Sequence, residues 1–222
     1  MPGACCTIIP TTVGRSNLPS YDLILASASR RRAEILSRMG VSYHVIAAHV
    51  DERATPDEKP SVYVQRIALD KAEAVIASQA RSTPVLAADT AVVVDECILG
   101  KPASMEDASS MLKRLSGCWH EVYTGVAIVH RKATVICVRT RVKFRPIVEH
   151  EIAVYWASGE PQDKAGGYAI QGLGGAFVER IDGSYSNVVG LPLSETLSLL
   201  DDYGVAHVFA LGARAAGSTS EA

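Results

Sequence analysis

The sequence has few aromatic residues and little net charge, and both shortages argue against certain partners. Phe, Trp and Tyr make up 6% of its 222 residues, which leaves few platforms on which single-stranded bases could stack. The formal net charge is −2 at pH 7, so the chain as a whole does not attract nucleic acid or anionic membranes. We expect no nucleic-acid or membrane partner, and an anionic ligand must be held by a local basic cluster.

Cysteines and long apolar runs are also scarce. The five cysteines are odd in number and form no C-x-x-C pair, which argues against a disulfide framework. We interpret them as reduced thiols and predict a cytoplasmic location. No apolar run approaches the roughly 18 residues needed to span a bilayer. The N-terminus lacks the features of a secretory signal, although Arg15 among several Ser and Thr residues leaves organelle targeting open.

The length fits one large α/β domain that can bury its own core. We predict three parts along the chain. Residues 1–20 lack periodicity and are expected to form a mobile leader, residues 21–212 form the folded domain, and residues 213–222 form a disordered tail.

Strand and helix patterns alternate through the folded domain. A buried strand at 23–26 is followed by a helix that ends near Gly40, a residue that suits a helix C-terminus. Further strands are predicted at 41–50, 84–88 (continued at 91–94), 122–130 and 134–144, and further helices at 61–78 (capped by Ser61), 105–115, 148–157 and 193–203. This pattern predicts an α/β fold with an antiparallel portion made by the 122–144 hairpin.

The segment Ser27-Ala28-Ser29-Arg30-Arg31-Arg32 follows the first predicted strand. A strand that leads through small residues into a helix exposes backbone N–H groups, which favour an anion. Three arginines in the first helical turn repel one another and have the unfavourable sign for the helix dipole. A bound polyphosphate would relieve this repulsion, because arginine forks suit phosphate oxygens. Solvation of an exposed basic patch is the alternative.

Acidic residues follow two of the predicted strands. Asp89 ends the apolar run that begins at Pro84, and α/β sheets bind ligands outside the carboxyl ends of their strands. Such a carboxylate could bind Mg²⁺ or accept a proton from water, whereas a turn-capping Asp is the ordinary alternative. Asp51 and Glu52 follow the strand predicted at 41–50 and offer a second carboxylate pair, unless they form a solvated turn.

Three lysines have unusual surroundings. Lys71 falls at helical spacing from Ile67 and Val75, on or beside an apolar helix face where lysines usually extend outward to water. Lys101 and Lys164 lie in glycine-containing segments, which permit a close approach to a ligand but also occur in ordinary turns. Each lysine is therefore a candidate ligand of an anion.

A glycine-rich segment, Gly166-Gly167-Tyr168-Ala169-Ile170-Gln171-Gly172-Leu173-Gly174-Gly175, could form a backbone cradle. It is not a P-loop, because the sequence contains no G-x-x-x-x-G-K-[ST]. Neither H-E-x-x-H nor G-x-S-x-G occurs, so metalloprotease and α/β-hydrolase chemistry have no support.

Taken together, these segments resemble the Maf family of nucleotide pyrophosphatases from about residue 23 to residue 203. Each motif is weak alone, but their common order is specific. The family usually has proline before its two arginines, where this chain has Arg30; the change loosens the turn but removes no proposed ligand. The resemblance is carried by Leu25-Ala26-Ser27-Ala28-Ser29, Arg31-Arg32, Val50-Asp51-Glu52, Ala88-Asp89-Thr90, Gly100-Lys101-Pro102, Asp163-Lys164-Ala165-Gly166, Tyr168-Ala169-Ile170-Gln171-Gly172, and Gly183-Ser184-Tyr185 through Gly190-Leu191-Pro192.

The resemblance implies an elongated mixed β-sheet flanked by helices, related to the inosine-triphosphate pyrophosphatases, with a cleft between two lobes. It also implies a homodimer that needs a divalent cation, Mg²⁺ or Mn²⁺. Asp89 is then the catalytic proton acceptor, and Glu52 and Asp89 are the metal ligands. The residues expected around the phosphates are Ser27, Arg31, Arg32, Lys71, Lys101 and Lys164.

By the same resemblance, the reaction splits a nucleoside triphosphate between its α- and β-phosphates, which removes unwanted nucleotides from the pool. One branch of the family prefers dTTP and UTP and another prefers 7-methyl-GTP. Arg31, Thr90 and Gln171 match the first branch, whose further candidate substrates are modified pyrimidine nucleotides. Two alternatives stay open: a non-catalytic nucleotide or nucleic-acid binding protein in cell-division control, and a phosphatase that removes the γ-phosphate.

Overall fold

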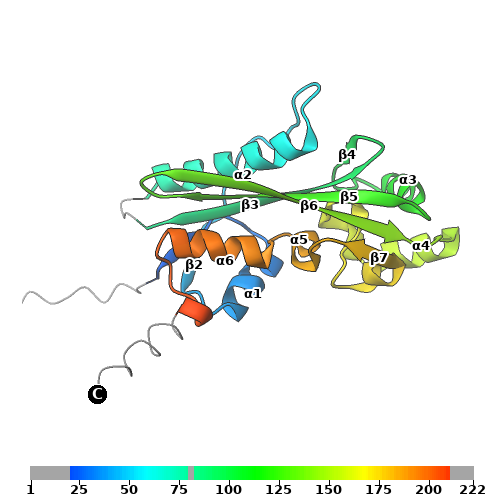
Figure 1. Cartoon of the computed structure of the whole chain (residues 1–222). Coiled ribbons are helices and arrows are strands. Elements are labelled where there is room, and N and C mark those ends of the chain that lie inside the picture. The colour runs from blue at the N-terminus through cyan, green and yellow to red at the C-terminus, as the bar shows by residue number, and fades with distance from the viewer. Residues whose placement is uncertain (1–20, 80–82, 211–222) are drawn as a thin grey trace, which may run out of the picture.

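The computed structural model describes residues 21–79 and 83–210, so the predicted leader and tail lie outside the described residues. Within these ranges one seven-stranded mixed sheet runs through the protein, with helices on both faces (Figure 1). The strand order is β2-β1-β3-β5-β6-β7, and β4 pairs with β3. The predicted α/β fold, a mixed sheet flanked by helices, is confirmed.

The elements have the following bounds. The strands are β1 (Leu23–Leu25), β2 (Tyr43–Val45), β3 (Val85–Val94), β4 (Cys97–Leu99), β5 (Trp119–Val129), β6 (Ala133–Phe144) and β7 (Val178–Asp182). The helices are α1 (Arg30–Arg38), α2 (Pro60–Ala77), α3 (Met105–Leu115), α4 (Glu149–Ala157), α5 (Tyr185–Val189) and α6 (Leu193–Asp202). Short 3-10 helices are η1 (Glu160–Asp163), η2 (Ala165–Gly167) and η3 (Leu173–Phe177).

The unequal lengths of β1 and β3 create the opening for the site. β1 lies parallel to β3 and ends at Leu25, which pairs with Leu86. β3 continues to Val94 and stays paired along this length with β5, with which it is antiparallel. The chain leaves the sheet after β1 and enters α1, so the second half of β3 passes beyond the carboxyl end of its neighbour.

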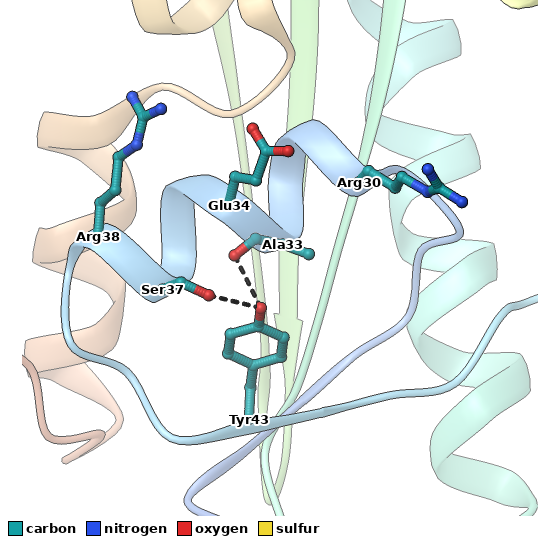
Figure 2. A pocket seen from close by; sticks show the side chains of 6 residues that line it. All are labelled: Arg30, Ala33, Glu34, Ser37, Arg38 and Tyr43. Atoms are coloured by element: carbon teal, nitrogen blue, oxygen red, sulfur yellow. Dashed lines mark hydrogen bonds between the residues drawn. The ribbon is translucent and has the colours of Figure 1, made fainter.

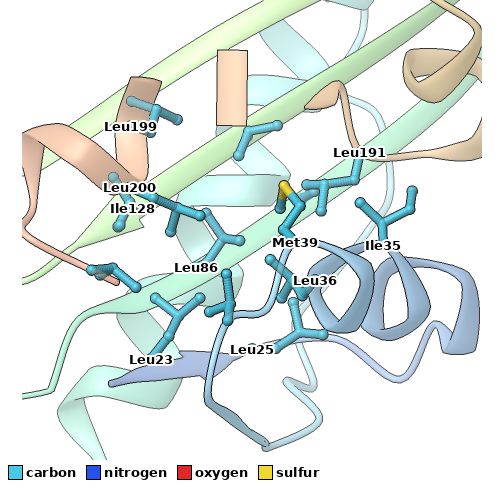
Figure 3. Close-up of a cluster of buried hydrophobic side chains, with 14 of the residues drawn as sticks. Leu23, Leu25, Ile35, Leu36, Met39, Leu86, Ile128, Leu191, Leu199 and Leu200 are labelled. Carbon is cyan, nitrogen blue, oxygen red and sulfur yellow. The ribbon is translucent and has the colours of Figure 1, made fainter. Parts of the chain in front are cut away.

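Apolar side chains cover both faces of the sheet at the β1 end. On one face, α1 and α6 pack against the sheet through residues such as Leu36, Leu86 and Leu200, which are fully buried (Figure 3). On the other face, α2 lies directly on β5: a Cβ at Gly125 would come within 2.2 Å of the Val64 carbonyl oxygen. Each fully buried leucine contributes about 1.5–3 kcal/mol relative to an exposed one.

A further core lies at the far end of the sheet. It gathers aromatic side chains around Phe144, with Tyr155, Tyr168 and Phe177 in contact at ring-centroid distances between 4.7 and 6.0 Å. Helices α3 and α4 lie at this end, away from α1 and α6 (Figure 1). The two ends of the sheet therefore carry separate cores, which correspond to the two predicted lobes.

Several sequence-based boundaries were right and others were wrong. The helix at 105–115 is confirmed as α3, and the hairpin is confirmed as β5–β6. The strand predicted at 41–50 is wrong beyond β2, because its partner β1 is only three residues long. Ser61 does not cap α2: the helix begins at Pro60, a favoured first residue, and Lys59 is the cap residue. The short elements β4, β7 and α5 were not predicted.

Within residues 21–79 and 83–210, we find no helix that is both long enough and apolar enough to cross a membrane.

Candidate active site

A cleft of about 770 Å³ lies beyond the carboxyl end of β1, and it is lined by the segment that joins β1 to α1, by residues of α1, α2, β3 and β4, and by the glycine-rich segment around η2. Six basic side chains and three carboxylates line it, although the whole chain has a net charge of −2. This local excess of positive charge favours an anionic ligand. The charged residues are Arg30, Arg31, Arg32, Lys71, Lys101, Lys164, Glu52, Asp89 and Asp163.

The N-terminus of α1 opens into this cleft. Arg30, Arg31 and Arg32 are its first three residues, and its first turn contains no acidic side chain. Ser29 makes no capping bond with its side chain. The Ser27 hydroxyl instead accepts bonds from the Ser29 amide and from Arg32 Nη1, both at 3.2 Å. The first turn therefore presents its positive end and its arginines to the cleft, as predicted.

Arg32 is fixed by three hydrogen bonds. Besides Ser27, its Nε donates to the Gly190 carbonyl oxygen at 2.8 Å and its Nη2 donates to Thr90 Oγ1 at 3.0 Å. Burial lowers the pKa of the Arg32 guanidinium, and the charge of Asp89 opposes this change. The side chain is thus a rigid cation in the wall of the cleft.

Lys71 lies between two carboxylates at the floor of the cleft. Its Nζ is 2.7 Å from Asp89 Oδ1 and 2.7 Å from Glu52 Oε1. Lys71 is 8% exposed and Asp89 is 7% exposed. A buried ammonium group requires such partners. Lys71 therefore does not extend to water, which was the ordinary alternative for a lysine on an apolar helix face.

Asp89 and Glu52 reach this place differently from what the sequence indicated. Asp89 is the fifth of ten residues of β3 and pairs with Gly125 of β5, so the prediction that it ends a strand was wrong. The site still lies at the carboxyl end of a strand, but that strand is β1. Glu52 lies in the long loop after β2, and the prediction that it directly follows a strand was also wrong.

Residues of α2 hold the loop that carries Glu52. The Tyr63 hydroxyl donates to the Glu52 carbonyl oxygen at 2.9 Å, and Arg66 donates to both carboxylate oxygens of Glu58 at 2.7 Å. Partial burial opposes ionisation of Glu52, but Lys71, Lys101 and Arg32 together hold its pKa below the ordinary value. Glu52 is therefore a stable carboxylate facing the cleft.

Tyr63 is a cleft residue that the sequence analysis missed. It lines the cleft, and burial together with the charges of Asp89 and Glu52 raises its pKa to about 12. Tyr63, Ile67 and Lys71 follow one another at intervals of four residues, so they share one face of α2. This spacing was a signal that could have identified Tyr63 once Lys71 was placed in the site.

Lys101 and Lys164 line the cleft from the segments after β4 and η1. Lys164 is paired with Asp163, and its side chain is 13% exposed. The adjoining turn needs a glycine, because Gly166 has a φ of +68° and a Cβ there would lie 2.8 Å from Val92 Cγ1. The glycine-rich segment therefore brings the backbone close to β3, which positions Lys164 at the cleft.

The cleft brings together nine of the ten side chains that the resemblance assigns to the site. Ser27, Arg31, Arg32, Glu52, Lys71, Asp89, Thr90, Lys101 and Lys164 line it. Gln171 is exposed and is not among the lining residues. Its role in base selection stays a prediction. Asp51, the other carboxylate of the predicted pair with Glu52, does not line the cleft and is paired with Arg53 at the surface.

A shallow depression of about 450 Å³ on the outer side of α1 is a weaker candidate for a site. Figure 2 shows Arg30 and Arg38 at its opposite ends, with their side chains pointing away from its centre. The Tyr43 hydroxyl at the centre is bonded to Ser37 Oγ and to the Ala33 carbonyl oxygen, both at 2.8 Å. No set of polar groups converges there, so the cleft remains the candidate site.

Among solved structures, the chain is similar to a HAM1 protein from Coxiella burnetii, with a TM-score of 0.46, 15% sequence identity, and coverage of 82% of this chain and 100% of that one.

Sequence relatives are much more similar. Proteins named dTTP/UTP pyrophosphatase from Hahella chejuensis and Pseudoalteromonas atlantica are each 50% identical to this chain, covering 82% and 83% of it and 92% and 98% of those proteins. One of the same name from Vibrio cholerae is 49% identical and covers 82% of this chain and 97% of that protein. The model of the family described as Maf-like protein matches residues 22–203. The chain therefore belongs to the Maf family.

Proposed function

We propose that the protein hydrolyses dTTP and UTP, and related modified pyrimidine nucleotides, to the nucleoside monophosphate and pyrophosphate. The names of relatives that are about 50% identical over most of the chain support this substrate class. The observation that carries the proposal is the contact of buried Lys71 with buried Asp89 and with the more exposed Glu52, at the floor of a cleft with basic walls. A reacting phosphate needs both parts, a proton acceptor and cations that offset its charge.

The basic side chains bind the triphosphate. Arg32 has five N–H donors and uses three of them within the protein, so one donor on each terminal nitrogen remains for a phosphate. Arg31 adds a second guanidinium beside the N-terminus of α1. Lys101 and Lys164 line the same cleft, and we assign them to the charge that builds up on the departing pyrophosphate.

Asp89 is the proposed proton acceptor. A water molecule attacks the α-phosphorus, the bond from that phosphorus to the oxygen bridging it to the β-phosphorus breaks, and the electron pair leaves with pyrophosphate. Asp89 takes the proton of the attacking water through Oδ2, while Lys71 Nζ holds Oδ1 at 2.7 Å. Lys71 therefore orients the carboxylate that accepts the proton.

Glu52 and Asp89 are the proposed ligands of Mg²⁺ or Mn²⁺. Both carboxylates face one ammonium group, and the described residues contain no group of three or more His, Cys, Asp or Glu side chains arranged for a metal. Two carboxylates fit Mg²⁺ when substrate oxygens and water complete its coordination. The cation would offset charge on the triphosphate oxygens.

The proposal includes a homodimer that acts in the cytoplasm. The cysteines of the described residues (Cys97, Cys118 and Cys137) are free thiols, which supports a reducing compartment. Gel filtration with light scattering would test the dimer.

Product analysis tests the activity. Purified protein is incubated with Mg²⁺ and dTTP or UTP, and phosphate products are separated by ion exchange. We expect equal amounts of monophosphate and pyrophosphate, and about a thousandfold slower release of both from Asp89→Asn prepared in parallel. Orthophosphate and a diphosphate would instead indicate removal of the γ-phosphate, and nucleotide binding without any release would indicate a binding protein.

A further inference from the structure

Thr124 of β5 is fully buried and lies directly behind the wall of the cleft. Its Oγ1 is 3.0 Å from Thr90 Oγ1 and 2.9 Å from the carbonyl oxygen of Asn187. Thr90 in turn accepts a hydrogen bond from Arg32 Nη2 at 3.0 Å. A chain of hydrogen bonds therefore connects Arg32 to α5, which has no residue in the proposed chemistry.

The direction of each bond in this chain is fixed. A hydroxyl group has one proton to donate, and the Asn187 carbonyl can only accept, so the Thr124 proton is directed to Asn187. Thr90 must therefore donate its own proton to Thr124. The lone pairs of Thr90 Oγ1 are left to accept from Arg32, which is always charged.

The chain closes into a ring at the end of α5. The Asn187 carbonyl oxygen also accepts from the Gly190 amide at 2.9 Å. The Gly190 carbonyl oxygen accepts from Arg32 Nε at 2.8 Å. Arg32 is thus attached twice to the same turn, directly through Gly190 and indirectly through Thr90 and Thr124.

We propose that Thr124 is a positioning residue for the reaction: through Thr90 it fixes the guanidinium of Arg32 so that the two remaining N–H groups face the phosphates. This inference rests on the proposed function. Rigid placement matters because a charged group that must reorient at each turnover stabilises the charge on the phosphates less than one that is already in position.

The ring also changes the role expected for Thr90. Its proton is committed to Thr124, so it does not donate to a pyrimidine carbonyl while the ring is intact. Thr90 then influences substrate choice through the placement of Arg32. Thr124 could not be predicted from the sequence, because threonine is a common residue in strands and gives no sign of a special role.

The test compares Thr124→Val with Thr124→Ser in the full-length protein. Valine keeps the shape of the side chain but removes the hydroxyl, whereas serine keeps the hydroxyl. Binding of inorganic pyrophosphate in the presence of Mg²⁺ is measured by calorimetry, and KM and kcat are measured with dTTP. We expect about tenfold weaker pyrophosphate binding for the valine variant and near wild-type binding for the serine variant. When Arg32 is already replaced by lysine, Thr124→Val should change pyrophosphate affinity by less than about twofold, because the group that Thr124 positions is absent.

Thr140→Val is the matched control. Thr140 is equally buried and bonds the same segment, accepting from Asn187 Nδ2 at 3.0 Å and donating to the Ser184 carbonyl at 3.2 Å. It has no hydroxyl link to Arg32. Equal loss of pyrophosphate affinity in both valine variants would overturn the proposal in favour of general support of the segment.

If Thr124→Val does not fold, Thr90→Val breaks the same ring at a half-buried residue. We then expect about tenfold weaker pyrophosphate binding for Thr90→Val and near wild-type binding for Thr90→Ser. Unchanged pyrophosphate binding in folded Thr90→Val would also overturn the proposal. Because the readout is binding, it still applies if dTTP and UTP prove not to be hydrolysed, a result that would contradict the proposed function alone.

Discussion

The ammonium group of Lys71 lies 2.7 Å from Oδ1 of Asp89, and both residues are buried. Lys71 belongs to α2, which covers one face of the sheet, and Asp89 belongs to the sheet itself. The pair therefore links the packing of α2 to the orientation of the proposed proton acceptor. Removing either partner of such a pair leaves a buried charge with less compensation.

Asp89→Asn should lower kcat for dTTP by about a thousandfold, because asparagine keeps the shape of the side chain but cannot accept the proton. The loss of the ion pair should lower the free energy of unfolding by about 1–3 kcal/mol, since Glu52 still compensates Lys71. Steady-state kinetics and urea unfolding measure the two effects. Asp163→Asn is the control: it alters another carboxylate of the cleft, and its kcat should stay within about threefold. Near-normal turnover of Asp89→Asn would remove Asp89 from the mechanism.

Arg31→Ala and Arg32→Ala should both weaken pyrophosphate binding by about ten- to a hundredfold, but they should differ in stability. Arg31→Ala relieves repulsion at the N-terminus of α1, so the free energy of unfolding should rise by up to about 0.5 kcal/mol. Arg32→Ala removes the hydrogen bonds to Gly190, Ser27 and Thr90, so the free energy of unfolding should fall by about 2 kcal/mol. Calorimetric titration and urea unfolding give both quantities. Equal stabilities would contradict the anchoring of Arg32.

This difference between two adjacent arginines shows where sequence reasoning stops. The small-residue turn, the helix start and the charge cluster could be predicted, because each depends on neighbouring residues. The three bonds of Arg32 could not, because two of them depend on Thr90 and Gly190, which are 58 and 158 residues away. The ring of hydrogen bonds through Thr124 could not be predicted for the same reason, because its members are far apart in the sequence.

The lysine and carboxylate of the floor show a similar limit. The sequence indicated that Lys71 lay on or beside an apolar helix face, but its position against β3 depends on how α2 packs on the sheet. Asp89 was assigned to a strand end because its polarity interrupts an apolar run. The pairing of β3 with β5 continues through it, since tertiary pairing overrides a single unfavourable residue.

Chelation of divalent cations should abolish turnover of dTTP, and Mg²⁺ or Mn²⁺ should restore it. Glu52→Gln should raise the Mg²⁺ concentration needed for half-maximal activity by about tenfold, because an amide is a weaker ligand than a carboxylate. A titration of activity against Mg²⁺ gives this value, and binding of Mn²⁺ followed by electron paramagnetic resonance gives it without turnover. Asp57→Asn, which alters an exposed carboxylate of the same loop that does not line the cleft, is the control. Full activity in excess chelator would contradict a metal requirement.

His120 should make the fold sensitive to mild acid. It is 2% exposed, its Nε2 lies 2.9 Å from the Tyr168 hydroxyl, and burial lowers its pKa from 6.5 to about 4. The unfolded chain therefore binds a proton at a higher pH than the folded chain does. The contribution to stability is complete above about pH 6.5 and is lost as the pH falls toward 4, by about 3 kcal/mol in total.

Urea unfolding at several pH values between about 7 and 4 measures this loss, and His120→Gln supplies the comparison. The variant should show a flatter dependence across this window, because it retains the other acid-sensitive groups but lacks the histidine. One such group is Glu58, whose bonds with Arg66 lower its pKa to about 2, so most of its effect appears at lower pH. Parallel curves for the two proteins would exclude His120 as the source.

Gln171 provides the test of base selection. The residue is exposed on a turn held by Glu160, whose carboxylate accepts from the amides of Leu173 at 2.8 Å and Gly174 at 3.0 Å. A glutamine amide both donates and accepts, which suits the carbonyl and N–H edge of uracil and thymine. Gln171→Ala should therefore lower kcat/KM for UTP and dTTP by about tenfold and leave pyrophosphate binding unchanged, because pyrophosphate has no base.

The matched control for Gln171 is Gln162→Ala, which removes another exposed glutamine of the same lobe, in η1. This control should change neither kcat/KM for UTP and dTTP nor pyrophosphate binding. Values of kcat/KM for UTP, dTTP, CTP, GTP and 7-methyl-GTP under one condition complete the test, with UTP and dTTP expected to be highest. A preference of the unmodified protein for 7-methyl-GTP would overturn the assignment of substrate. An unchanged ranking in Gln171→Ala would instead keep the substrate and place base selection in residues that line the cleft, where Arg31 is the remaining predicted contact.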